Sequence, residues 1–96
     1  MFDSKVITAL DGVEKVLPED GKTLEPCLYS SISFDPAATA TLTVAFDYGL
    51  GLGTPVAITT KENTQFTSIG LKRVSVLSTG SDSDFRFVTA ADVGGL

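Results

Sequence analysis

Runs in which apolar and polar residues alternate recur along the chain, and glycine, proline, aspartate and serine separate them at short intervals. In the clearest run, residues 39–48, apolar residues at every second position face a set that is mostly threonine: Leu42, Val44, Phe46 and Tyr48 against Thr41, Thr43, Ala45 and Asp47. A period of two belongs to a strand with one buried face, whereas a half-buried helix repeats every ~3.6 residues. No helical period competes with this alternation, so the sequence predicts an all-β fold.

Eight segments carry the strand pattern: residues 5–10, 13–17, 28–34, 39–48, 54–60, 65–72, 73–78 and 84–89. Asp11-Gly12 lies between the first two and is typical of a type I′ turn, which predicts a hairpin there. Segments 71–80 and 84–88 predict a second, closing hairpin across a polar turn. Between Gly70 and Arg73 the apolar parity shifts, which predicts a bulge or a corner.

The length of 96 residues fits one domain, which can bury about 64% of the surface that the unfolded chain exposes. The chain is 43% hydrophobic and 20% charged, too apolar and too weakly charged for a disordered protein. We therefore expect a single β-sandwich or jelly-roll-like domain of about seven or eight short antiparallel strands over residues 1–92. Residues 93–96 are expected to form a short C-terminal tail.

The charge balance bears on the partners of the chain. The net charge is −5, and the few basic residues are scattered, which argues against nucleic-acid binding. The apolar stretches are far shorter than the roughly 20 residues that span a bilayer, so no membrane partner is expected. The N-terminus shows no basic start followed by an apolar block, so the chain is expected to be made in the cytoplasm.

Catalytic residue types are scarce. The chain has no histidine and a single cysteine, which excludes an intramolecular disulfide and a Ser-His-Asp triad and leaves no histidine to activate the thiol. Cys27 is expected to be a small buried side chain. Asp82 and Asp84 lie in a polar loop but supply too few carboxylates for a calcium loop. Carbohydrate binding often uses aromatic platforms, and the chain has no tryptophan, with Tyr29 and Tyr48 as its only tyrosines, so the sequence argues against carbohydrate binding. We expect no enzyme activity, no cofactor and no metal.

The segment Gly49-Leu50-Gly51-Leu52-Gly53 is the most conspicuous local feature. It resembles a phosphate-binding glycine loop, but a strand pattern follows it where such a loop needs a helix N-terminus. Leu50 and Leu52 would be apolar side chains at the tip of a loop, and the serines and threonines number twenty-one, which gives a polar surface with few charges. Because charges are depleted from interface cores, we expect a subunit of an assembly. The candidate interface residues are Phe2, Leu50, Leu52, Val93 and Leu96.

The alternating segment from Thr39 to Phe46 and the closing segments 71–80 and 84–88, in a chain without disulfides, resemble the small all-β virion proteins of bacteriophages, above all the head decoration or cement type. The resemblance implies a β-sandwich, often trimeric, that binds the major capsid protein or other virion subunits and stabilises the assembled head. It also implies a location in the virion. No family motif assigns individual residues.

Two alternatives come from other classes. The chain could be another phage structural subunit, in the connector, the tail or a fibre, and copy number per particle would separate that role from a head protein. It could also be a small monomeric binding or adhesion module, which would stay monomeric when purified.

Overall fold

The structure is a computed structural model that describes residues 6–18 and 30–89, with the side chains described as far as Arg86. Eight strands and no helix make up the described part of the chain, which confirms the predicted all-β fold. In chain order the strands are β1 (Val6–Ala9), β2 (Lys15–Leu17), β3 (Ser30–Asp35), β4 (Thr41–Asp47), β5 (Val56–Ile58), β6 (Glu62–Phe66), β7 (Arg73–Thr79) and β8 (Ser83–Thr89).

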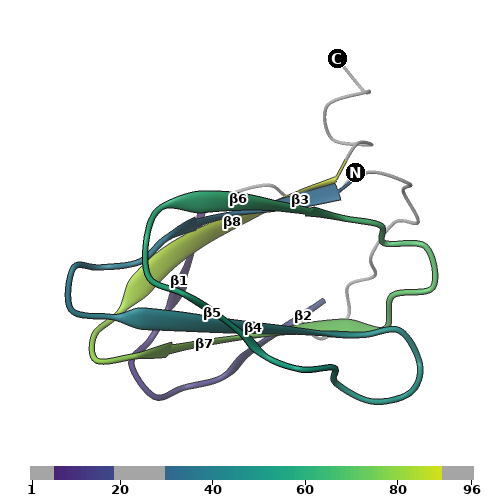
Figure 1. Ribbon diagram of the computed structural model, residues 1–96, viewed down its shortest axis with the longest axis horizontal. Coiled ribbons are helices and arrows are strands. Elements are labelled where there is room, and N and C mark those ends of the chain that lie inside the picture. The colour runs from purple at the N-terminus through teal and green to yellow at the C-terminus, as the bar shows by residue number, and fades with distance from the viewer. Residues whose placement is uncertain (1–5, 19–29, 90–96) are drawn as a thin grey trace.

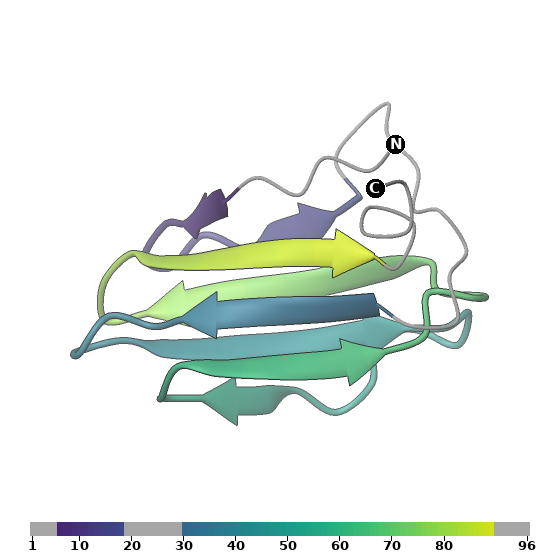
Figure 2. The ribbon, with the colours of Figure 1, turned by 90° about the horizontal axis from the view of Figure 1, so that it is seen from above.

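The strands form two four-stranded sheets that lie face to face as the layers of a sandwich (Figures 1 and 2). One sheet has the order β1-β8-β3-β6 and the other the order β2-β7-β4-β5. Every neighbouring pair is antiparallel. The predicted β-sandwich of short antiparallel strands is therefore confirmed.

The pairing is nested along the chain. β1 pairs with β8, β2 with β7, β3 with β6 and β4 with β5, so the chain behaves as one long hairpin rolled into two layers. β3–β8 and β4–β7 then join these pairs within each sheet. This is the strand arrangement of a jelly roll.

Both predicted hairpins are wrong, because the strands pair in the nested order. β1 and β2 lie in different sheets, and so do β7 and β8. A type I′ turn needs positive φ at both central residues, and Gly12 has φ 75° while no residue other than glycine has positive φ in the described part of the chain. Instead Gly12 N donates to Ser78 O at 2.8 Å, and Asp11 Oδ1 accepts from Gly80 N at 3.0 Å. These hydrogen bonds hold the β1–β2 connection against the end of β7, where the chain passes from one sheet to the other.

Two strand boundaries also differ from the prediction. Residues 61–64 lay between the predicted strands 54–60 and 65–72, but Glu62 and Asn63 belong to β6, which ends at Phe66 and not at residue 72. The predicted corner is present just before β7, where Leu71 N donates to Ser68 O at 3.1 Å as the chain crosses between the sheets. Because sheet crossing breaks the alternation, the parity shift indicated the corner correctly.

The core fills the space between the two sheets. β3 and β8 contribute Phe34 and Phe85, which are directly opposite each other, with ring centroids 6.4 Å apart. Eleven buried side chains form one cluster: Ala9, Leu17, Ile32, Phe34, Leu42, Val44, Ile58, Leu71, Val74, Val76 and Phe85. Leu42 and Val44 point inward as the alternation predicted. Cys27 lies outside the described residues.

Candidate functional site

The β4–β5 connection holds the glycine segment at one end of the sandwich, where it extends beyond the sheet (Figure 1). Gly49 and Gly51 have φ of 112° and 91°, a region that side chains with a Cβ rarely adopt. Gly53 N donates to Phe46 O at 2.9 Å, and Leu52 forms an isolated bridge with Asp47. The segment therefore folds back on the end of β4 in a defined conformation.

Asp47 is the residue that fixes this loop. Its Oδ1 accepts from Gly49 N at 2.8 Å and from Gly51 N at 3.1 Å, and its Oδ2 accepts from Arg73 Nε at 3.0 Å. Its backbone oxygen accepts from Lys72 N at 2.7 Å. The side chain is buried, although the alternation placed it on the outer face, because the loop covers it. One carboxylate thus joins the β4–β5 loop to the start of β7.

The electrostatics of Asp47 follow from these contacts. The hydrogen bond from Gly49 N and then that from Arg73 stabilise the ionised carboxylate, and they outweigh the opposing effect of desolvation. The pKa of Asp47 is consequently lowered from its ordinary value of 3.8. The loop is held by a charged group at neutral pH.

A second contact joins this loop to the β6–β7 connection. Tyr48 Oη donates to Thr67 O at 2.7 Å, and partial burial raises the pKa of this phenol. The Tyr48 ring lies alongside Phe46, with centroids 6.5 Å apart. A connection within one sheet and a connection that crosses between the two sheets are therefore fixed side by side.

These two connections expose apolar side chains together. Leu50 is fully exposed, Ile69 is 54% exposed, Tyr48 46% and Leu52 39%. We call these four residues the apolar end. A fully exposed leucine on a loop tip that a buried carboxylate fixes is typical of a contact surface.

No protein-family model matches the sequence, and comparisons with curated proteins and with solved structures give no match either. The resemblance to bacteriophage virion proteins therefore stays a prediction. No helix in the described part of the chain is long and apolar enough to cross a membrane.

The structure places two of the five predicted interface residues, Leu50 and Leu52, together in the apolar end. Phe2, Val93 and Leu96 lie outside the described residues, as does the predicted tail. Tyr48 and Ile69 were not predicted as interface residues, because the alternation assigned each to a strand face. The signal that could have found them is position, since each lies next to a glycine in a connection between strands.

The carboxylates of Asp82 and Asp84 accept hydrogen bonds from other segments of the fold. Asp82 Oδ1 accepts from Asp11 N at 2.8 Å, and Asp84 Oδ1 accepts from Thr8 Oγ1 at 2.8 Å. Within residues 6–18 and 30–89, no group of three or more His, Cys, Asp or Glu side chains could hold a metal ion. These carboxylates join β8 and its preceding turn to β1 and the connection after it.

Proposed function

We propose that this protein is a structural subunit of a bacteriophage virion, a decoration or cement protein that docks on the assembled head through its apolar end. The observation that carries the proposal is Leu50, fully exposed on a loop that Asp47 fixes. A free flexible loop would lose conformational entropy on binding, whereas this loop is already ordered. The contact is therefore preorganised.

Burying one leucine side chain contributes about 1.5–3 kcal/mol, which is small for one contact. A shell offers many equivalent sites, and a subunit that binds only the assembled lattice stabilises that lattice at every site. The partner is the major capsid protein or another virion subunit, with an apolar pocket that receives Leu50. The jelly-roll topology supports this role by analogy, because viral capsid domains use it, as do unrelated proteins.

Sedimentation of the native source material tests the proposal. We expect the chain to travel with particles of megadalton mass, at hundreds of copies in each. A few copies in each particle would favour a connector, tail or fibre subunit. Recovery only as a slowly sedimenting monomer would overturn the virion role and favour a small binding module. A trimer is the expected state of the purified protein, and sedimentation equilibrium measures it.

A matched pair of variants tests the docking surface. Leu50→Asp places a charge at the tip and is expected to abolish rebinding of the purified protein to particles stripped of it. Leu10→Asp makes the same change at an exposed leucine in the β1–β2 connection, which pairs with the end of β7 and not with its start, where Asp47 lies, and is expected to rebind normally. Circular dichroism verifies the fold of both. Normal rebinding of Leu50→Asp would remove the apolar end from the contact.

A further inference from the structure

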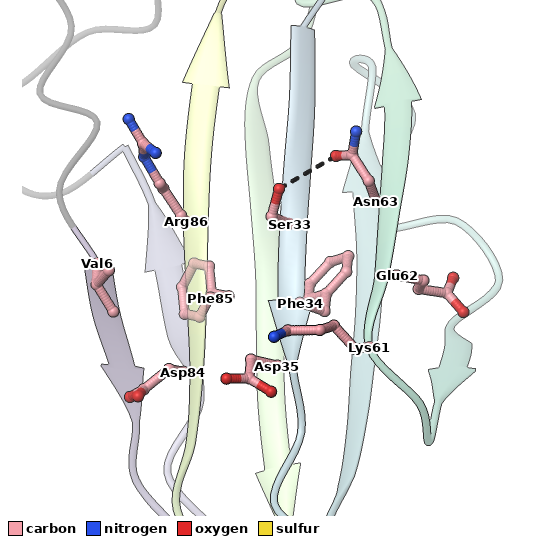
Figure 3. A pocket seen from close by; sticks show the side chains of 10 residues that line it. All are labelled: Val6, Ser33, Phe34, Asp35, Lys61, Glu62, Asn63, Asp84, Phe85 and Arg86. Carbon is pink, nitrogen blue, oxygen red and sulfur yellow. Dashed lines mark hydrogen bonds between the residues drawn. The ribbon is translucent and has the colours of Figure 1, made fainter.

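The outer face of the β1-β8-β3-β6 sheet carries a groove of about 480 Å³. Ten residues from all four strands and the β5–β6 connection line it: Val6, Ser33, Phe34, Asp35, Lys61, Glu62, Asn63, Asp84, Phe85 and Arg86 (Figure 3). The groove reaches the last residue of β3 and the first residue of β6, which lie at the other end of the sandwich from the apolar end. We call it the outer groove. It belongs to neither the core nor the proposed docking surface.

Strand register arranges the outward side chains in two rows. In the first row Val6 is opposite Arg86, Arg86 opposite Ser33, and Ser33 opposite Asn63. In the second row Asp84 is opposite Asp35, and Lys61 just precedes β6 on the far side. Neighbouring strands lie about 4.8 Å apart, and residues two apart on a strand about 6.8 Å. The two rows therefore hold polar side chains close enough for one small ligand to contact several of them.

Ser33 creates the hollow. It is the shortest side chain of the first row and lies between the longer Arg86 and Asn63 (Figure 3). Phe34 and Phe85 are buried in the core beneath it, and the exposed lining of the groove is mostly apolar, with the polar groups of the two rows around it. A larger side chain at position 33 would fill this space.

The groove offers acceptors and donors side by side. Asp84 Oδ1 accepts from Thr8 Oγ1, which leaves Oδ2 as an acceptor, and Asn63 Oδ1 is 3.3 Å from the donor Ser33 Oγ, which leaves the amide nitrogen as a donor. The side chains of Asp35 and Lys61 have no hydrogen bond or ion pair to the residues that the structure describes. Like charges directly across a strand pair, as in Asp35 and Asp84, repel each other. A ligand that donates hydrogen bonds to both would offset that repulsion.

We propose that the outer groove binds a neutral saccharide of one or two sugar residues. A strongly anionic ligand would meet Asp35 and Asp84, and a strongly cationic one would meet Lys61 and Arg86. Sugar hydroxyls donate to carboxylates and accept from ammonium and amide groups at the same time, so a neutral polyhydroxyl ligand satisfies both sets. Without an aromatic platform the affinity is low, with a dissociation constant on the order of 1 mM.

Titration of the ¹⁵N-labelled protein with glucose, galactose, mannose, maltose and lactose, followed by NMR, tests the proposal. We expect saturable shifts with at least one of these sugars, centred on Ser33, Asn63 and Asp84. No shift with any of them up to about 100 mM would overturn the proposal. Shifts in the groove with the mixed-charge dipeptide Lys-Glu but with no sugar would also overturn it.

Variants locate the site. Ser33→Leu fills the hollow and is expected to weaken sugar binding at least about tenfold, while Thr59→Leu, on the exposed β5–β6 connection, leaves it unchanged. Asp35→Asn keeps the shape, removes a charged acceptor and is expected to weaken binding severalfold. Unchanged binding in both groove variants would overturn the assignment. Leu50→Asp should bind sugar normally, so this test and the test of docking are independent.

Discussion

Asp47 and Arg73 face each other directly across the β4–β7 pair, and Arg73 Nε donates to Asp47 Oδ2 at 3.0 Å. The arginine side chain is 46% exposed and the aspartate 11%. Because solvent screens the arginine, the ion pair by itself contributes little to stability. The hydrogen bond from Gly49 N is the largest cause of the lowered pKa of Asp47, and together with that from Gly51 N it ties the carboxylate to the loop.

The stability that ionised Asp47 contributes to the fold should depend on pH. Since the pKa of Asp47 is lower in the folded chain than its ordinary 3.8, the ionised form stabilises the fold. This contribution is fully present above about pH 4 and is lost as pH falls through the lowered pKa. Asp47→Asn removes it, so the difference in melting temperature between the wild-type protein and the variant should be constant near neutral pH and shrink below about pH 4. Thermal unfolding followed by circular dichroism measures this. A difference that grows on acidification would contradict the assignment.

Gly80 in the β7–β8 turn is predicted to tolerate no side chain. A Cβ there would collide with the backbone oxygen of Thr39, and the φ of 102° is itself strained for alanine. Gly80→Ala should therefore destabilise the fold by at least about 2 kcal/mol. Gly53→Ala is the control, because its Cβ would lie at an ordinary 3.4 Å from Phe46 O. Urea denaturation compares them, and equal effects would show that the β7–β8 turn can relax.

The aromatic pair in the core should dominate stability. Phe34 is 1% exposed and packs against Phe85, so Phe34→Ala leaves a cavity that costs about 3–5 kcal/mol. Small domains have only about 5–15 kcal/mol in total, so the variant should be close to unfolded at 37 °C. Ile69→Ala removes an exposed side chain and should change stability by less than about 0.5 kcal/mol. Denaturation curves of the two variants check the contrast.

Ser78 is a fully buried hydroxyl that joins three segments. Its Oγ is 2.6 Å from Ser81 O and 3.2 Å from Ser83 Oγ, which in turn accepts from Ala37 N at 3.1 Å. Ser78→Ala should cost about 1 kcal/mol, because Ser81 O loses its donor. Amide exchange at Ala37 should also become faster. Unchanged exchange would mean that Ser83 holds Ala37 without help from Ser78.

Local alternation in the sequence predicted the strands and their buried faces well, as Ile32, Phe34, Leu42 and Val44 show. It failed for strand pairing, because a dipeptide such as Asp11-Gly12 reports only the local turn, whereas closure of the sandwich decides which strands meet. The outer groove could not be predicted from the sequence for a related reason. Lys61, Glu62 and Asn63 read as a charged turn, and only the β3–β6 register places Asn63 opposite Ser33.

Asp47 was missed because its position in the alternation gives it an outward direction. Its burial depends on a loop that folds back over it, and period-two reasoning describes strands alone. Two of the four residues of the apolar end were predicted, since Leu50 and Leu52 lie between glycines. Tyr48 and Ile69 join them only because the β4–β5 connection meets the β6–β7 connection, which crosses between the sheets.

Nested pairing has a consequence for synthesis on the ribosome. Thr8 in β1 meets Asp84 in β8, a partner 76 residues later in the chain. The innermost pair, β4 with β5, can form as soon as residue 58 has emerged, but β2 and β1 must wait for the last two strands. Closing such distant pairs is slow. We therefore expect the β2-β7-β4-β5 sheet to be completed once residue 79 has emerged, and the β1-β8-β3-β6 sheet only once residue 89 has emerged, so that the sandwich closes last at its N-terminal strand.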